Sequence, residues 1–214
     1  ALLGLLIAFT FSGATSRFDE RRNLIVEETN DISTAYLRLD LLPAITQPAL
    51  RELFREYMNA RLETYQKMPD MNAAKIPFDR AIKLQEEIWR QAVAAAAMDG
   101  APLAANTLLL PALNQMFDIT NTRMMAMKKH PPTVIFVLLF AMALISALLA
   151  GFGMAHGKSR SWVHIIGFTL TMALAVNIII NIEYPRRGMI RLDSFDQALW
   201  ELLESMNPGQ TIKQ

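Results

Sequence analysis

Residues 133–155 read TVIFVLLFAMALISALLAGFGMA, and residues 162–182 read WVHIIGFTLTMALAVNIIINI. The first stretch has no ionisable side chain, and the second has only His164, near its start. At about 1.5 Å per residue, a helix of either length crosses a hydrocarbon core of about 30 Å. Because a charge inside such a helix is costly in lipid, we predict transmembrane helices over residues 131–156 and 162–185, joined by an external link at 157–161.

A third apolar segment, ALLGLLIAFTFSGATS, occupies residues 1–16 and continues without a break into RFDERR. Its length as a helix, about 24 Å, is marginal for a membrane span. It also lacks the basic start and the small-residue cleavage site of a signal peptide. We therefore expect residues 1–16 to be the end of a transmembrane helix whose beginning precedes Ala1, which brings the expected number of spans to about three.

The distribution of lysine and arginine near the span ends predicts the orientation in the membrane. Basic residues follow the first segment, precede the second and follow the third: Arg17, Arg21, Arg22, Arg123, Lys128, Lys129, Arg186, Arg187 and Arg191. The link contains only Lys158 and Arg160. We therefore expect a multi-pass protein of the bacterial inner membrane, with residues 17–130 and 186–214 on the cytoplasmic side. The net charge of +1 gives no indication of nucleic-acid binding, and the absence of cysteine excludes disulfides and thiolate chemistry.

The insert between the first two spans, residues 17–130, has helical periodicity throughout and no strand signal. We predict amphipathic helices over residues 18–42, 48–68, 78–98 and 102–129, the last kinked at Pro111, with a loop at residues 67–77. A further helix and a tail are expected in residues 186–214. The predicted fold class is therefore all-α: a polytopic membrane protein with a cytoplasmic helical insert.

Three segments resemble a known family. They are FTFSGATSRFDERRNLIVEETNDISTAYLRLDLLP at residues 9–43, LLLPALNQMFDITNTR at 108–123 and NIEYPRRGMIR at 181–191. These segments resemble signatures of the bacterial bestrophin-like membrane proteins, a family first defined as a domain of unknown function. The resemblance implies an all-helical membrane protein, related in name to the bestrophin ion channels, which are pentamers. The acidic calcium-binding run of the bestrophins has no counterpart here beyond Asp193 and Asp196, so calcium gating is not implied.

No arrangement of residues predicts catalysis, a metal site or a cofactor. The three histidines, His130, His156 and His164, lie at or near span ends without metal-ligand spacing. Glu27 and Glu28 are adjacent and so point to different sides of a helix. Because no nucleophile is paired with a base, we do not expect an enzyme.

Two asparagines interrupt the last apolar span. Asn177 and Asn181 are one helical turn apart, and Glu183 follows at the end of the span. An amide in lipid needs a partner, so the pair either hydrogen-bonds to a neighbouring helix or lines a polar path repeated around an oligomer. Both readings are open, and interhelical hydrogen bonding is the commoner role of asparagine in such helices. We take Asn177, Asn181 and Glu183 as pore-lining candidates.

Two further sets of residues have predicted structural roles. A buried polar network is expected to join the first and fourth insert helices, and its candidates are Glu28, Arg38, Asp40, Asn114, Asp118 and Arg123. Small residues at four-residue steps predict close helix packing in the membrane. They are Gly4, Ala8 and Ser12 in the first span, and Ala143, Ala147 and Gly151 in the second.

These observations favour an oligomeric ion channel of bestrophin-like type. Three or four short helices per chain seldom enclose a conduit, so a pore would need a homo-oligomer, for which the resemblance suggests a pentamer. The expected partners are membrane lipids, inorganic ions and further copies of the chain, and no cofactor or nucleic acid. The alternative is a non-conducting membrane scaffold or sensor whose insert binds a protein partner.

Overall fold

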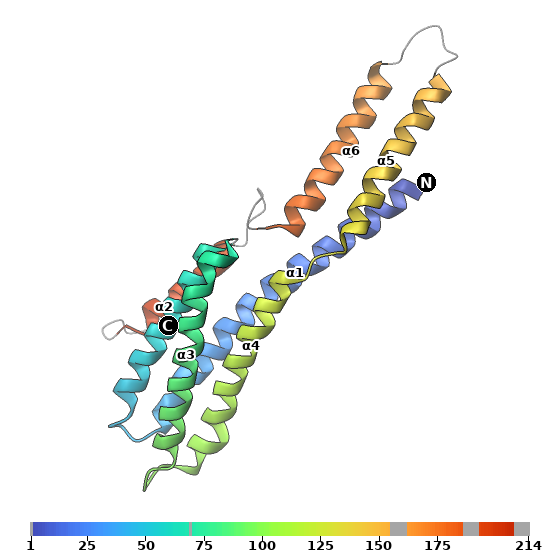
Figure 1. Cartoon of the computed structure of the whole chain (residues 1–214). Coiled ribbons are helices and arrows are strands. Elements are labelled where there is room, and N and C mark those ends of the chain that lie inside the picture. Colours follow the sequence, from blue (N-terminus) through green and yellow to red (C-terminus); the bar gives the residue numbers. More distant parts are fainter. Residues whose placement is uncertain (1, 69, 155–161, 186–192, 208–214) are drawn as a thin grey trace. The chain divides into compact units, whose positions relative to one another are not determined.

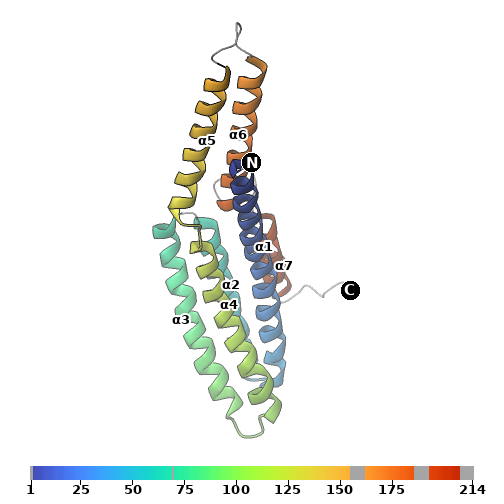
Figure 2. The ribbon, with the colours of Figure 1, turned by 90° about the vertical axis from the view of Figure 1, so that its right-hand side faces the viewer.

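The computed structural model describes residues 2–68, 70–154, 162–185 and 193–207, and within these ranges all regular structure is helical. The elements appear in Figures 1 and 2. Their bounds are α1 (Leu2–Leu37), the 3₁₀ turn η1 (Arg38–Leu41), α2 (Gln47–Lys67), α3 (Met71–Ala96), the π-helix η2 (Ala105–Leu109), α4 (Leu110–Lys128), α5 (Thr133–Met154), α6 (Trp162–Glu183) and α7 (Asp193–Ser205). The predicted all-α fold class is thus confirmed.

The chain divides into two compact units. The span unit comprises residues 1–20 and 127–191, and the insert unit comprises residues 21–126 and 192–214. Helix α1 contributes its first part to the span unit and its second part to the insert unit. Helix α7, from the C-terminal region, belongs to the same unit as the insert helices.

The span unit contains two apolar helices that run side by side, α5 and α6 (Figures 1 and 2). Two helical stretches are long and apolar enough to cross a membrane: the one that contains α5 and ends at Met154, and α6. Their side chains are largely exposed: Leu148 is 72% and Val163 is 81% accessible. Surfaces this apolar need lipid or another chain to cover them. The first segment, residues 1–16, is not among the described helices that meet this requirement, so a third span stays a prediction.

The described core of the span unit is small. Ala14 of α1 packs against Ile179 and Ile182 of α6, and three partly buried apolar side chains surround them: Ile7, Phe18 and Phe136. These contacts bring the first part of α1 and the start of α5 against the end of α6. The polar residues at these helix ends are therefore close together.

The insert unit has a continuous core in which α2 packs along α3. The apolar stripe of α2 is entirely buried and consists of Leu50, Phe54, Tyr57, Arg61 and Tyr65. Helix α7 packs on α2, where it buries Leu199 and Leu203. The hydroxyl of Tyr36 and the guanidinium of Arg55 donate to the carbonyl of Met206, at 3.4 and 3.2 Å, and so hold the end of α7.

Three helix boundaries differ from the predicted ones. Helix α1 ends at Leu37 and tightens into η1, instead of continuing to Leu42. The predicted loop at residues 67–77 was wrong from Met71 onward, because the carboxylate of Asp70 caps α3 by accepting from the backbone N–H groups of Asn72 and Ala73. Before Pro111, where we predicted a kink, the helix widens into the π turn η2. Proline lacks the N–H that a regular α turn requires.

Candidate functional site

The two asparagines of α6 form a hydrogen-bonded pair. Nδ2 of Asn181 donates to the backbone carbonyl of Asn177 at 2.8 Å and to its side-chain oxygen at 2.7 Å. A backbone carbonyl can only accept, so this contact fixes the orientation of the Asn181 amide and hence that of Asn177. The side chain of Asn177 is exposed. Its oxygen accepts from Asn181, which leaves its NH₂ group as the part of the amide with no hydrogen-bond partner among the described residues. An exposed amide is thus present in an apolar helix.

Glu183, at the end of α6, is fully buried. Its Oε2 accepts from Nε and Nη2 of Arg17, at 2.9 and 2.7 Å, and its Oε1 lies 2.9 Å from Nδ1 of His130. The ring of His130 stacks on that of Tyr184, with centroids 4.7 Å apart. The carboxylate therefore ties α6 to α1 and to the segment before α5, and within one chain it does not face outward as a pore-lining group would.

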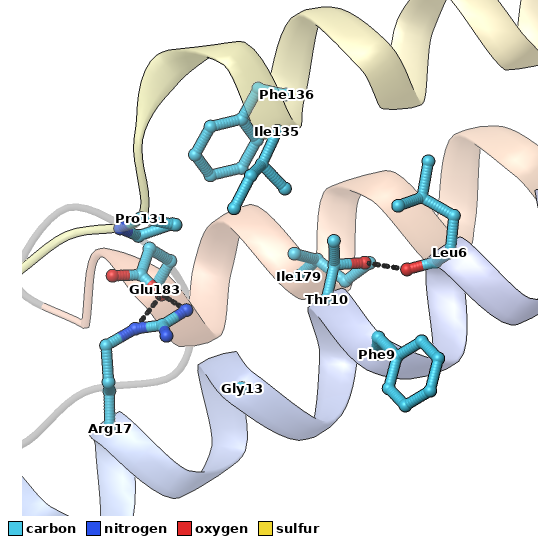
Figure 3. A pocket seen from close by; sticks show the side chains of 10 residues that line it. All are labelled: Leu6, Phe9, Thr10, Gly13, Arg17, Pro131, Ile135, Phe136, Ile179 and Glu183. Atoms are coloured by element: carbon cyan, nitrogen blue, oxygen red, sulfur yellow. Dashed lines mark hydrogen bonds and ion pairs between the residues drawn. The ribbon is translucent and has the colours of Figure 1, made fainter.

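A pocket of about 190 Å³ lies beside this ion pair (Figure 3). Residues from α1, from α6, from the start of α5 and from the segment just before it line the pocket: Leu6, Phe9, Thr10, Gly13, Arg17, Pro131, Ile135, Phe136, Ile179 and Glu183. The hydroxyl of Thr10 donates to the carbonyls of Leu6 and Ile7, each at 2.9 Å, so it adds little polarity. A Cβ atom at Gly13 would lie 3.3 Å from Nη1 of Arg17, so glycine leaves room for the guanidinium.

A charged cluster is buried in the insert unit. The carboxylate of Glu28 accepts from Arg61 at 2.8 Å, from Arg123 at 2.5 Å and from the hydroxyl of Tyr65 at 2.7 Å. The guanidinium of Arg123 lies 3.6 Å from the centroid of the Tyr65 ring. Burial raises the pKa of Glu28, but the charges and hydrogen bonds of Arg61 and Arg123 outweigh it and hold the pKa below the ordinary value. The cluster joins α1, α2 and α4.

Three uncharged polar side chains are buried beside this cluster. The hydroxyl groups of Tyr57 and Thr120 are 2.8 Å apart, and the amide of Gln85 donates to them at 3.2 and 3.3 Å. Burial raises the pKa of Tyr57. Because Gln85 belongs to α3, the polar interior connects four helices. Buried groups satisfied in this way favour one specific arrangement of helices over alternatives.

Of the six residues predicted to form a network, the structure brings together Glu28 and Arg123. Arg38 instead donates to the carbonyl of Leu108 at 2.6 Å, and Asp40 pairs with Arg51. The remaining two candidates, Asn114 and Asp118, are exposed. Sequence reasoning missed Arg61 and Tyr65 as members. The available signal was Arg61 itself, a charge on the apolar stripe of α2, which requires a buried counter-charge.

Most of the small residues predicted to pack helices lie on the surface of the part of the chain that the structure describes. Gly4, Ala8, Ser12, Ala147 and Gly151 are exposed, and Ala143 is half-buried. A Cβ built at Gly4 or at Gly151 meets no atom within 4 Å. Their role as contacts between subunits stays a prediction. Among the residues that the structure describes, there is no group of three or more His, Asp or Glu side chains that could hold a metal ion.

The sequence model of one family matches the chain. That family is described as a Bestrophin-like domain, and the match covers residues 1–194. No curated protein and no solved structure matches the chain.

Proposed function

From the premise that the chain belongs to the bestrophin-like domain family, we propose that it is an oligomeric, passive ion channel and not an enzyme. Its subunits are copies of the same chain, and the pentamer of the bestrophin channels is the assembly we favour. The span unit lies in the bacterial inner membrane, and the insert unit is cytoplasmic. Conduction needs no cofactor.

The observation that carries this proposal is the exposed amide of Asn177. In a single chain its NH₂ group would face lipid, where a donor without an acceptor is unfavourable by about 1–3 kcal/mol. In a ring of subunits the same amide faces a neighbouring helix or a water-filled axis. The apolar exposure of α5 and α6 supports the same conclusion, because these helices have little to pack against inside the chain.

The test is ion flux into liposomes that contain the purified protein, with chloride and potassium gradients compared separately. Replacing Asn177 and Asn181 together by Leu is expected to change flux or its ion preference several-fold. The matched control is Thr171→Leu, which removes a polar group from the same helix away from the amide face and is expected to leave flux unchanged. Unchanged flux in a folded double variant would make the amides packing elements and overturn their pore-lining role.

A second candidate function is a non-conducting membrane scaffold or sensor. Four exposed apolar side chains in and beside η1 and η2, two turns in mutual contact, favour it: Leu37, Ile45, Leu103 and Leu108, between 45% and 82% accessible. Such groups on an insert unit are typical of a protein-docking surface. Absence of flux from inserted, oligomeric protein would favour this function over the channel.

A further inference from the structure

We propose that the pocket of the span unit holds an acyl chain of an anionic membrane phospholipid, whose phosphate pairs with Arg17. This inference goes beyond the proposed channel, because it assigns a ligand site and does not depend on ion flow. It rests on the apolar interior of the pocket, on the free donor atom of Arg17 and on the position of both at the ends of the apolar helices.

The interior of the pocket suits a hydrocarbon group. Its volume, about 190 Å³, exceeds the roughly 150 Å³ of an apolar cavity that stays dry and binds benzene. Most of the lining is aliphatic or aromatic carbon, and Figure 3 shows Leu6, Phe136 and Ile135 around it. Water gains few hydrogen bonds in such a space, whereas a lipid chain buries apolar surface there.

Arg17 gives the pocket a preference for negative charge. Its Nε and Nη2 are used by Glu183, but among the described residues Nη1 has no hydrogen-bond partner. The side chain is 21% exposed, whereas both carboxylate oxygens of Glu183 are engaged and the carboxylate is fully buried. The group that remains available is therefore a guanidinium N–H, for which a phosphate oxygen is a strong acceptor.

The position of the pocket identifies a membrane lipid as the source of that phosphate. Arg17 directly follows the apolar segment 1–16, and Glu183 directly follows the apolar segment 162–182. Where apolar spans end in charged residues, lipid headgroups meet the protein. The walls of the pocket come from the same apolar helices, so a chain of a neighbouring lipid can enter from the hydrocarbon layer.

The experiment measures phospholipid retained by the purified full chain after detergent washing, by mass spectrometry, from bilayers of phosphatidylglycerol and phosphatidylcholine in equal amounts. Ile135→Trp and Leu6→Phe fill the pocket from two different helices. Arg17→Lys keeps a positive charge opposite Glu183 but removes the Nη1 group that would bind the phosphate. The matched control is Val137→Trp, which places the same bulk on α5 at a side chain that is 60% exposed and does not line the pocket.

We expect the unmodified chain and Val137→Trp to retain phosphatidylglycerol several-fold more than phosphatidylcholine. Both filled variants should retain several-fold less lipid, and Arg17→Lys should lose the preference for the anionic headgroup. Circular dichroism identifies any variant that has not folded. If one of the two pocket-filling variants fails to fold, the lipid retained by the other one tests the proposal. Equal retention by the filled variants and the control, or equal retention of the two lipids by the unmodified chain, would overturn the proposal whether or not the protein conducts ions.

Discussion

Glu28 shows at the scale of one residue how charge is accommodated inside the insert unit. Its carboxylate has no solvent exposure and accepts hydrogen bonds from two arginines and a tyrosine hydroxyl. Burying these ions carries a large desolvation penalty, which is offset only while all the partners are present. The cluster is therefore expected to be sensitive to the loss of any one member.

We predict that Glu28→Gln lowers the free energy of unfolding by about 3–5 kcal/mol, since it leaves two buried arginines without a counter-charge. Urea denaturation followed by circular dichroism in detergent measures the change. The control is Glu63→Gln, which removes a carboxylate that pairs with Lys67 and Arg80 and is 36% exposed. An exposed pair contributes at most about 1 kcal/mol, so equal effects of the two substitutions would contradict this account.

The lowered pKa of Glu28 predicts how stability depends on pH. Because the folded state binds this proton less tightly than the unfolded state, the contribution of Glu28 is complete above its ordinary pKa of 4.5 and is lost as the pH falls through the folded value. The difference in stability between the unmodified chain and Glu28→Gln should therefore shrink as the pH falls from about 4.5 to about 2. Denaturation midpoints of both proteins across this range provide the measurement. A constant difference would show that Glu28 does not titrate over this interval.

Helix α3 contains a proline in its interior, where proline disfavours a helix. Pro77 lies inside the helix, beyond the first turn that tolerates proline, and it removes a backbone hydrogen bond. The Asp70 cap and the buried stripe of α3, which includes Ile88 and Ala92, compensate for that loss. Tertiary packing thus extends the helix through a segment whose local sequence resembles a loop.

Pro77→Ala is expected to stabilise the insert unit by up to about 3 kcal/mol, reduced by the packing that the buried ring provides. Thermal denaturation should show a higher midpoint. Pro48→Ala is the matched control: Pro48 lies in the first turn of α2, where no N–H is needed, and its replacement should bring no gain. A lower midpoint for Pro77→Ala than for Pro48→Ala would mean that the packing lost with the ring of Pro77 outweighs the backbone hydrogen bond gained.

At the scale of the whole molecule, the apolar surface of the span unit is left uncovered by the chain itself. Two of the small residues of α5, Ala147 and Gly151, line a shallow groove on this surface together with leucine and phenylalanine side chains. Close approach of a second helix requires such residues, because lipid supplies no hydrophobic drive for association. Assembly of several copies would use this face.

We predict that Ala147→Phe weakens the homo-oligomer without unfolding the chain, since Ala147 is exposed and makes no internal packing. Native mass spectrometry of the detergent-solubilised protein should detect smaller species. Leu138→Phe, also on α5 and 49% exposed, should leave the assembly intact. An unchanged oligomer in the Ala147 variant would exclude this face as a subunit contact.

Sequence alone predicted the class of this protein through patterns that hold over many residues. Uncharged runs indicated α5 and α6, and helical periodicity indicated that the insert consists of amphipathic helices. The family resemblance is confirmed over residues 1–194. Such patterns are local, because helix periodicity and membrane length are properties of consecutive residues.

Only the tertiary structure decided which distant groups meet. The sequence contained Arg61, Arg123 and Glu28 as separate charges, and their common site depends on how three helices pack. The same holds for Glu183, which a linear reading placed at a pore mouth and the fold encloses beside Arg17. The continuation of α3 through Pro77 also followed from packing, because burial of an apolar face outweighs the local preference of a proline-containing segment.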